Sequence, residues 1–98
     1  MTFPVEVRLS AQIEAEEAIE FYEGRRKGLG AELRSAIEMT IEGICSHPHS
    51  GREFIPGVRR VLVPKFKHRV FYVVESDRIV VIGIYHPAQL DSDLPDRV

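Results

Sequence analysis

Hydrophobic and polar residues alternate along this chain with two different periods. Residues 5–9 alternate apolar and charged side chains, which is typical of a short strand with one face on a core. Over residues 11–24 and 31–45, apolar side chains recur at three- and four-residue steps and predict two amphipathic helices. Ser10 is placed to cap the first helix, and the Gly28-Leu29-Gly30 segment favours a tight turn between the two. We therefore expect an antiparallel helical hairpin after the first strand.

The second half of the chain has the composition of a β-sheet. Residues 47–57 are rich in Pro, Gly and Ser and predict a loop. Residues 58–63, 69–75 and 79–85 are rich in Val, Ile, Phe and Tyr and predict three consecutive antiparallel strands. The expected fold class is therefore α+β, with the N-terminal strand followed by a helical hairpin that packs on one face of an antiparallel β-sheet.

The middle strand of the three is apolar on both faces. Val70, Tyr72 and Val74 alternate with Phe71 and Val73, so each set lies on its own side of the sheet. The hairpin can cover only one of these faces. We expect the other face to bind a partner chain or a second copy.

Composition limits the kinds of protein that this chain represents. With 98 residues, 44% hydrophobic and 29% charged, it predicts one domain over residues 1–98, of which 87–98 form a C-terminal tail. No apolar run is long enough for a membrane span, and we expect a cytoplasmic protein. Cys45 is the only cysteine, and His47 and His49 have no acidic or cysteine ligands nearby, so we expect neither a metal nor a cofactor.

Basic residues are concentrated in one segment, although the net charge is −2. No acidic residue interrupts the stretch that contains Arg59, Arg60, Lys65, Lys67, His68 and Arg69. Such a cluster can attract an anionic partner, either a phosphate or an acidic protein. The alternative is a set of edge-strand and loop charges that keep the strands soluble.

Several short motifs then occur in a characteristic order. They are Tyr22 late in the first helix, Gly28-Leu29-Gly30 at the turn, His47-Pro48 and Gly51 after the second helix, Val58-Arg59-Arg60, Phe66 before the middle strand, Tyr72 within it, and His86 after the last strand. In order and spacing they resemble the ParE/RelE superfamily of toxins from bacterial type II toxin–antitoxin systems. The resemblance is to the ParE branch, which includes plasmid stabilisation proteins. It extends along nearly the whole chain.

The resemblance implies a toxin that a cognate ParD-like antitoxin neutralises in a hetero-oligomer. ParE-like members poison DNA gyrase, whereas RelE-like members cleave messenger RNA on the ribosome. For cleavage, the resemblance implies proton transfer and charge stabilisation by Lys65, Lys67, Arg69, Tyr85 and His86. Such nucleases rely on an arginine just after the last strand, where this chain has a neutral glutamine, so we expect a protein-binding toxin rather than a ribonuclease.

The resemblance also implies a binding surface for the target or the antitoxin. Its candidates are Arg59, Arg60, Phe66, Arg69, Phe71, Val73, His86, Gln89, Leu94 and Arg97. In related toxins the last three places often hold an arginine, an aromatic residue and an arginine, and only Arg97 keeps that pattern. Two alternatives remain open: His86 as a hydrogen-bonded histidine that ends a strand, and the whole chain as a decayed toxin that only binds antitoxin.

Overall fold

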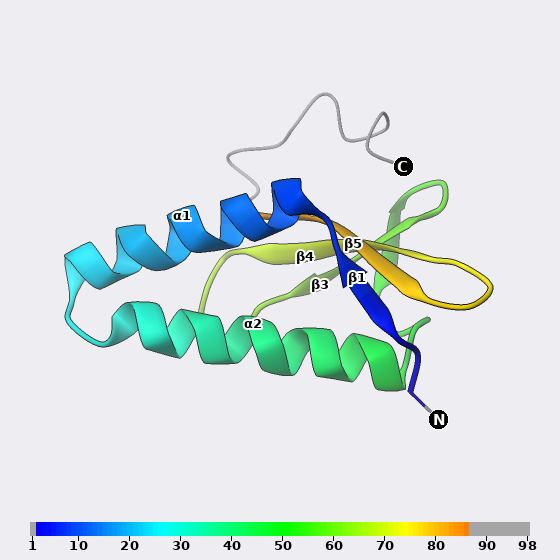
Figure 1. Ribbon diagram of the computed structural model, residues 1–98, viewed down its shortest axis with the longest axis horizontal. Helices are drawn as coiled ribbons and strands as arrows, with labels where there is room; N and C mark the ends of the chain where they lie inside the picture. The colour runs from blue at the N-terminus through cyan, green and yellow to red at the C-terminus, as the bar shows by residue number, and fades with distance from the viewer. Residues whose placement is uncertain (1, 87–98) are drawn as a thin grey trace.

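The structure is a computed structural model that describes residues 2–86 of the chain. Within these residues, the elements in chain order are β1 (Val5–Val7), α1 (Leu9–Arg25), α2 (Leu29–Ser46), β2 (Arg52–Ile55), β3 (Val58–Leu62), β4 (Arg69–Val74) and β5 (Ile79–Tyr85). The two helices run antiparallel on one side of the sheet (Figure 1). No helix in this part of the chain is long and apolar enough to cross a membrane.

The five strands form one sheet in the order β1-β5-β4-β3-β2. The pairs β2–β3, β3–β4 and β4–β5 are antiparallel, whereas β1 lies parallel to β5. The α+β fold class is therefore confirmed, and the sheet is mixed rather than wholly antiparallel. The parallel pair follows from the topology, because the hairpin leads the chain to β2 at the far edge of the sheet, and the next three strands return it to β1.

The segment expected as a loop contains a strand. β2 pairs with β3 in the register Arg52↔Arg60, and a bulge between Glu53 and Ile55 interrupts the pairing. Gly57 has a φ of 84°, a left-handed conformation that glycine adopts at low cost, and it lies between the two strands. The prediction of an uninterrupted loop over residues 47–57 was wrong, because pairing with β3 stabilises a strand that is too short to show a clear pattern.

The first helix begins earlier than the sequence pattern predicts. Its N-cap is Arg8, which is extended and makes no side-chain capping bond. Ser10 lies inside the first turn, and its hydroxyl donates to the carbonyl of Ile82 at 3.4 Å. The prediction that Ser10 caps the helix was wrong. The hydroxyl instead connects α1 to β5.

The hairpin turn is held by one carboxylate. Gly28 has a φ of 91° and is the N-cap of α2. The side chain of Glu23 accepts hydrogen bonds from the backbone N–H groups of Gly28 and Gly30, at 3.0 to 3.1 Å. A Cβ on Gly30 would lie 2.8 Å from the carbonyl oxygen of Ile19, so the two helices approach closely at this glycine. The predicted turn is confirmed, although Gly30 belongs to the second helix.

Apolar side chains form a cluster on each face of the sheet. The cluster under the helices includes Ala11, Ala18, Leu33, Ile37, Ile44, Val63, Phe66, Val70, Tyr72, Ile79, Val81 and Ile84. The cluster on the other face includes Val58, Phe71, Val80, Ile82 and Tyr85, with Phe54, Ile55 and Val73 packed against it. The two faces of β4 are therefore separated as the alternation predicts.

The face opposite the helices is not open at its centre. Phe71, which we expected on an uncovered surface, is only 1% exposed. Its ring stacks on Tyr85 at a centroid distance of 4.5 Å and meets Phe54 edge-on at 5.6 Å. The expectation was wrong for Phe71, because β2, which the sequence pattern did not reveal, brings Phe54 against it.

A β-bulge determines where the end of β5 points. Phe71 pairs with Gly83 and Tyr72 with Val81, so Ile82 is an extra residue in β5. Past the bulge the alternation is reversed. Ile84 therefore joins the cluster under the helices and Tyr85 the cluster on the other face.

Candidate functional site

Two hollows flank the helical hairpin. The first, which we call the α1–β5 pocket, has a volume of about 760 Å³, and the second, the α2–β3 groove, about 700 Å³. Both are large enough to hold several side chains or a small molecule. Each hollow contains residues that the sequence pattern singled out.

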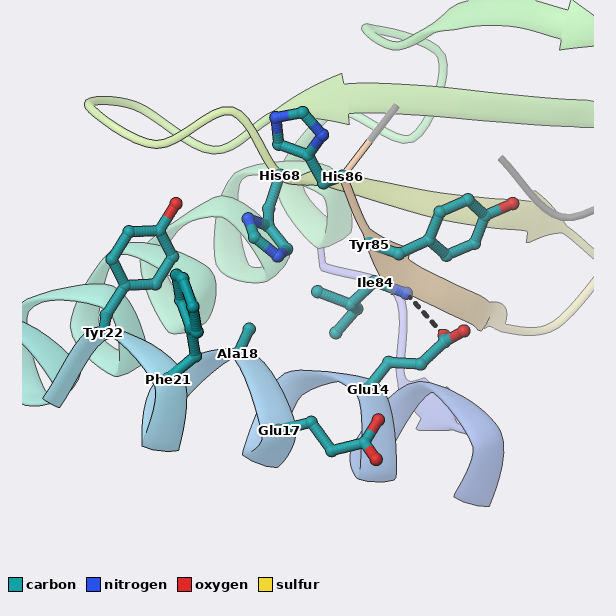
Figure 2. Close-up of a pocket in the computed structure, with 9 residues that line it drawn as sticks. All are labelled: Glu14, Glu17, Ala18, Phe21, Tyr22, His68, Ile84, Tyr85 and His86. Carbon is teal, nitrogen blue, oxygen red and sulfur yellow. Dashed lines mark hydrogen bonds between the residues drawn. The ribbon is translucent and has the colours of Figure 1, made fainter. Parts of the chain in front are cut away.

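The α1–β5 pocket is formed by one face of α1 and the end of β5 (Figure 2). Its lining consists of Glu14, Glu17, Ala18, Phe21, Tyr22, His68, Ile84, Tyr85 and His86. The five residues from α1 share a face because they recur at three- and four-residue steps. Figure 2 shows Phe21 and Tyr22 of α1 at one end of the pocket and Tyr85 at the other.

Glu14 connects the two walls of this pocket. Its carboxylate accepts a hydrogen bond from the backbone N–H of Ile84 at 3.1 Å. This hydrogen bond holds α1 against the end of β5. Glu17, one helical turn further on, leaves its side chain exposed at the pocket.

His68 is the buried polar residue of the pocket. It is only 7% exposed, and its ring meets those of Tyr22 and His86 edge-on at centroid distances of 5.9 and 5.8 Å. Among the residues that the structure describes, none forms a hydrogen bond with its Nδ1. Burial, and to a lesser degree the charge of His86, lowers the pKa of His68, so the neutral imidazole is favoured.

Sequence reasoning noted His68 within the basic segment but did not select it as a site residue. The signal was present in the alternation. His68 lies two residues before Val70 and four before Tyr72, so it shares the face that packs under the helices. His86, which was selected, lies beside it.

The α2–β3 groove is mostly apolar. Its lining consists of Glu32, Ser35, Ala36, Met39, Thr40, Gly43, Ile44, His47, Ser50, Val61, Leu62, Pro64, Lys65 and Phe66. Met39 is 70% exposed and Leu62 is 51% exposed, so two large apolar side chains meet solvent there. Phe66 is buried and meets Tyr22 edge-on at 5.2 Å, which places this candidate between the core and the groove. Lys65 contributes a positive charge to the groove wall. Its backbone has a φ of 70°, in the left-handed region.

Arg59 and Arg60 point to opposite faces of the sheet. The guanidinium of Arg59 donates to the carbonyls of Gly51 at 2.7 Å and His49 at 3.3 Å, so it holds the segment before β2. The guanidinium of Arg60 lies 4.6 Å from the ring centroid of Phe54, within the range of a cation–π interaction. Only Arg60 belongs to the face opposite the helices.

Arg69 shares that face. It is in phase with Phe71, which pairs directly with Arg60 on β3. Its guanidinium donates to the backbone carbonyl of Lys67 at 3.1 Å. Val73 packs at the margin of the same apolar cluster. Arg60 and Arg69 therefore flank a buried aromatic pair on one side of the sheet.

Four of the five candidates for RNA cleavage lie around the start of β4 and the end of β5, because Arg69 pairs with Tyr85 and donates to the carbonyl of Lys67, and His86 follows Tyr85. Lys65 lies apart from them. Lys65 lines the α2–β3 groove, His86 lines the α1–β5 pocket, and Arg69 lies on the face opposite the helices. Tyr85 is only 3% exposed. Lys67 is exposed in the turn before β4. Gln89, Leu94 and Arg97 lie outside the described residues.

Comparisons with known proteins agree with this architecture. A solved structure of a chromosomal ParDE toxin–antitoxin system from P. aeruginosa matches 87% of this chain and 96% of the other, with a TM-score of 0.65 and 14% sequence identity. The toxin–antitoxin complex RelBE2 from Mycobacterium tuberculosis matches 88% of this chain and 99% of the other, with a TM-score of 0.60 and 12% identity. At these identities the likeness shows the fold.

A search of curated protein sequences finds no significant match. A family model described as the ParE toxin of the type II toxin–antitoxin system, parDE, matches residues 5–90. That range includes every strand and helix described above. The chain therefore belongs to the ParE toxin family of type II toxin–antitoxin systems.

Proposed function

We propose that this toxin inhibits DNA gyrase and that a cognate ParD-like antitoxin keeps it inactive by occupying the α2–β3 groove. The observation that carries the antitoxin part is the pair of exposed apolar side chains, Met39 and Leu62, on the walls of a mostly apolar groove. Large apolar side chains exposed along one groove of a small domain favour a protein partner. An amphipathic arm of the antitoxin would bury them.

Charge supports an acidic antitoxin surface on the other side of the sheet. Arg60 and Arg69 share one face and have no carboxylate partner among the residues described. Acidic residues of the antitoxin would pair with them and speed association. Arg59 contributes less to this attraction, because its guanidinium is already bonded to two backbone carbonyls.

Family membership supports gyrase as the target, together with the separation of Lys65 from His86. General acid–base cleavage requires the proton acceptor, the proton donor and the cations within hydrogen-bond reach of one phosphate. Here Lys65 and His86 line different hollows and Tyr85 is buried. This arrangement favours a protein-binding toxin over the RelE-like ribonuclease.

The test is inducible expression of the chain in a bacterial host, followed by growth, DNA-damage response and transcript integrity. A gyrase inhibitor arrests growth with DNA breaks, and co-expression of the antitoxin restores growth. Purified toxin is then added to gyrase in a supercoiling assay, where loss of supercoiling is expected. Arrest with ribosome-dependent transcript cleavage would instead identify a ribonuclease, and normal growth with soluble protein would identify a module that only binds antitoxin.

A further inference from the structure

The α1–β5 pocket has a charge and shape that neither the antitoxin nor the gyrase proposal uses. Two carboxylates, of Glu14 and Glu17, belong to its lining, and no lysine or arginine does among the described residues. Both carboxylates come from α1, in the half of the chain where acidic residues outnumber basic ones. A negative pocket with partly apolar walls repels phosphate and attracts cations.

Aromatic rings form much of the remaining wall. Phe21 is 58% exposed, and the rings of Tyr22 and Tyr85 line the same space. The faces of such rings attract cations. One such cation–π contact is present in the protein itself, because the guanidinium of Arg25 lies 5.5 Å from the ring centroid of Phe21.

His68 supplies an independent sign of a missing hydrogen-bond partner. Its side chain is more than nine-tenths buried at the pocket wall, and its Nδ1 has no hydrogen-bond partner within residues 2–86. A buried polar atom without a partner costs free energy that a bound ligand can recover. A neutral imidazole has one nitrogen with a free lone pair, which accepts from an N–H group.

From these features we infer that the α1–β5 pocket binds an alkyl cation, a guanidinium or ammonium group on an aliphatic stem. The charged end meets Glu17, its N–H groups are donors for the imidazole of His68, and the stem lies against Phe21 and Tyr22. Glu14 adds negative charge while its carboxylate holds the N–H of Ile84. Such a group occurs at the end of an arginine or lysine side chain of another protein and in free polyamines.

The inference is tested on the full chain by NMR titration with butylguanidinium and with butylurea, its neutral analogue of similar shape. Butylguanidinium is expected to shift the ring signals of His68 and Tyr22 in a saturable way, and butylurea is not. Equal shifts from both compounds would overturn the inference, because binding would then not depend on charge.

A matched pair of variants on α1 tests the site itself. Glu17→Gln removes a pocket carboxylate, and Glu20→Gln removes an exposed carboxylate that does not line the pocket. We expect Glu17→Gln to weaken binding of butylguanidinium about fivefold and Glu20→Gln less than twofold, since one partly exposed ion pair contributes on the order of 1 kcal/mol. Equal weakening by both variants would show only long-range attraction and overturn the site.

Two further titrations distinguish the sources of the cation. Spermidine represents a free polyamine, and a blocked arginine peptide represents a protein side chain. Tighter saturation of the same His68 signal by spermidine indicates a diffusible ligand, and tighter saturation by the peptide indicates a protein partner. Failure of both to shift that signal would overturn the inference. None of these outcomes depends on gyrase inhibition.

Discussion

The hydroxyl of Tyr72 organises the segment between α2 and β2. It donates to the carbonyl of Pro48 at 2.8 Å and accepts from the N–H of Gly51 at 3.1 Å, while its ring is fully buried. A Cβ on Gly51 would lie 2.5 Å from this hydroxyl, so the glycine permits the contact. One side chain of the central strand therefore fixes the loop that leads to the edge of the sheet.

Replacing Tyr72 with Phe leaves two backbone groups without partners. We expect Tyr72→Phe to reduce the free energy of unfolding by about 1–3 kcal/mol, as measured by urea denaturation. Tyr22→Phe is the matched control, because no hydrogen bond is recorded for that hydroxyl among the described residues. Equal losses in the two variants would show that the hydroxyl of Tyr72 has no special role.

The low pKa of His68 makes stability depend on pH. The folded protein favours the neutral imidazole, so below the ordinary pKa of 6.5 the unfolded chain binds more protons than the folded one. We therefore expect the free energy of unfolding to fall as the pH drops from above 6.5 toward the lowered pKa of the folded state. Urea denaturation at a series of pH values measures this slope.

His68→Gln is expected to flatten that slope. If His68→Gln kept the full pH dependence, another group would be responsible. His86 is the nearest charge that contributes, and the other titratable groups that line the same pocket are Glu14, Glu17, Tyr22 and Tyr85.

Among the secondary-structure elements, α2 and β3 form the groove proposed for the antitoxin. We expect Met39→Glu to weaken antitoxin binding at least about tenfold, because a central apolar contact is lost and a charge is placed against an apolar partner. Calorimetric titration with the purified antitoxin measures the change. Stability should hardly change, since Met39 is 70% exposed.

Ile13→Glu is the control for this prediction. Ile13 is 50% exposed on α1 and lines neither hollow. The same substitution there is expected to leave antitoxin affinity unchanged. A Met39→Glu variant that binds as tightly as the unaltered toxin would place the antitoxin elsewhere.

Sequence periodicity predicted most of the helices and strands but missed β2. The helices and the last three strands were predicted because each repeats its pattern over at least five residues. β2 was missed because its four residues follow Gly51 and precede Pro56 and Gly57, so turn residues dominate the local pattern. Its stability comes from pairing with β3, which no local pattern reveals.

The candidate site was only partly predictable for the same reason. Periodicity placed Tyr72 on one face of the middle strand with Val70 and Val74, but it gave no information about which hollow a residue would line. The separation of Lys65 from His86 depends on the close packing of two helices over five strands. The bulge at Ile82 also decides the face of Tyr85, and no residue before it signals a bulge.

For the whole molecule, charge is distributed by face rather than by position in the sequence. Arg59, Arg60 and Arg69 lie within eleven residues of one another in the sequence. Of the three, Arg60 and Arg69 share the face opposite the helices, and Arg59 points to the other face. The basic segment of the sequence is thus divided into a charged surface and a structural contact.

Reversing the charge of that surface should weaken both antitoxin binding and toxicity. We expect Arg60→Glu combined with Arg69→Glu to lower antitoxin affinity about tenfold or more, mostly at low salt, because opposite charges become like charges. Growth on induction and antitoxin titration measure the two effects. Lys27→Glu, an exposed change at the hairpin turn, is the control, and unaltered antitoxin affinity in the double variant would contradict charge pairing.

The parallel pairing of β1 with β5 has a consequence for biosynthesis. Val5 pairs with Ile79 and Val7 with Val81, and the N–H of Ile79 donates to the carbonyl of Pro4. β1 therefore has no strand to pair with until β5 has been made. Contacts between such distant parts of a chain slow folding. The sheet of this toxin consequently cannot be completed before β5 is made, so until then the nascent chain lacks its finished surfaces.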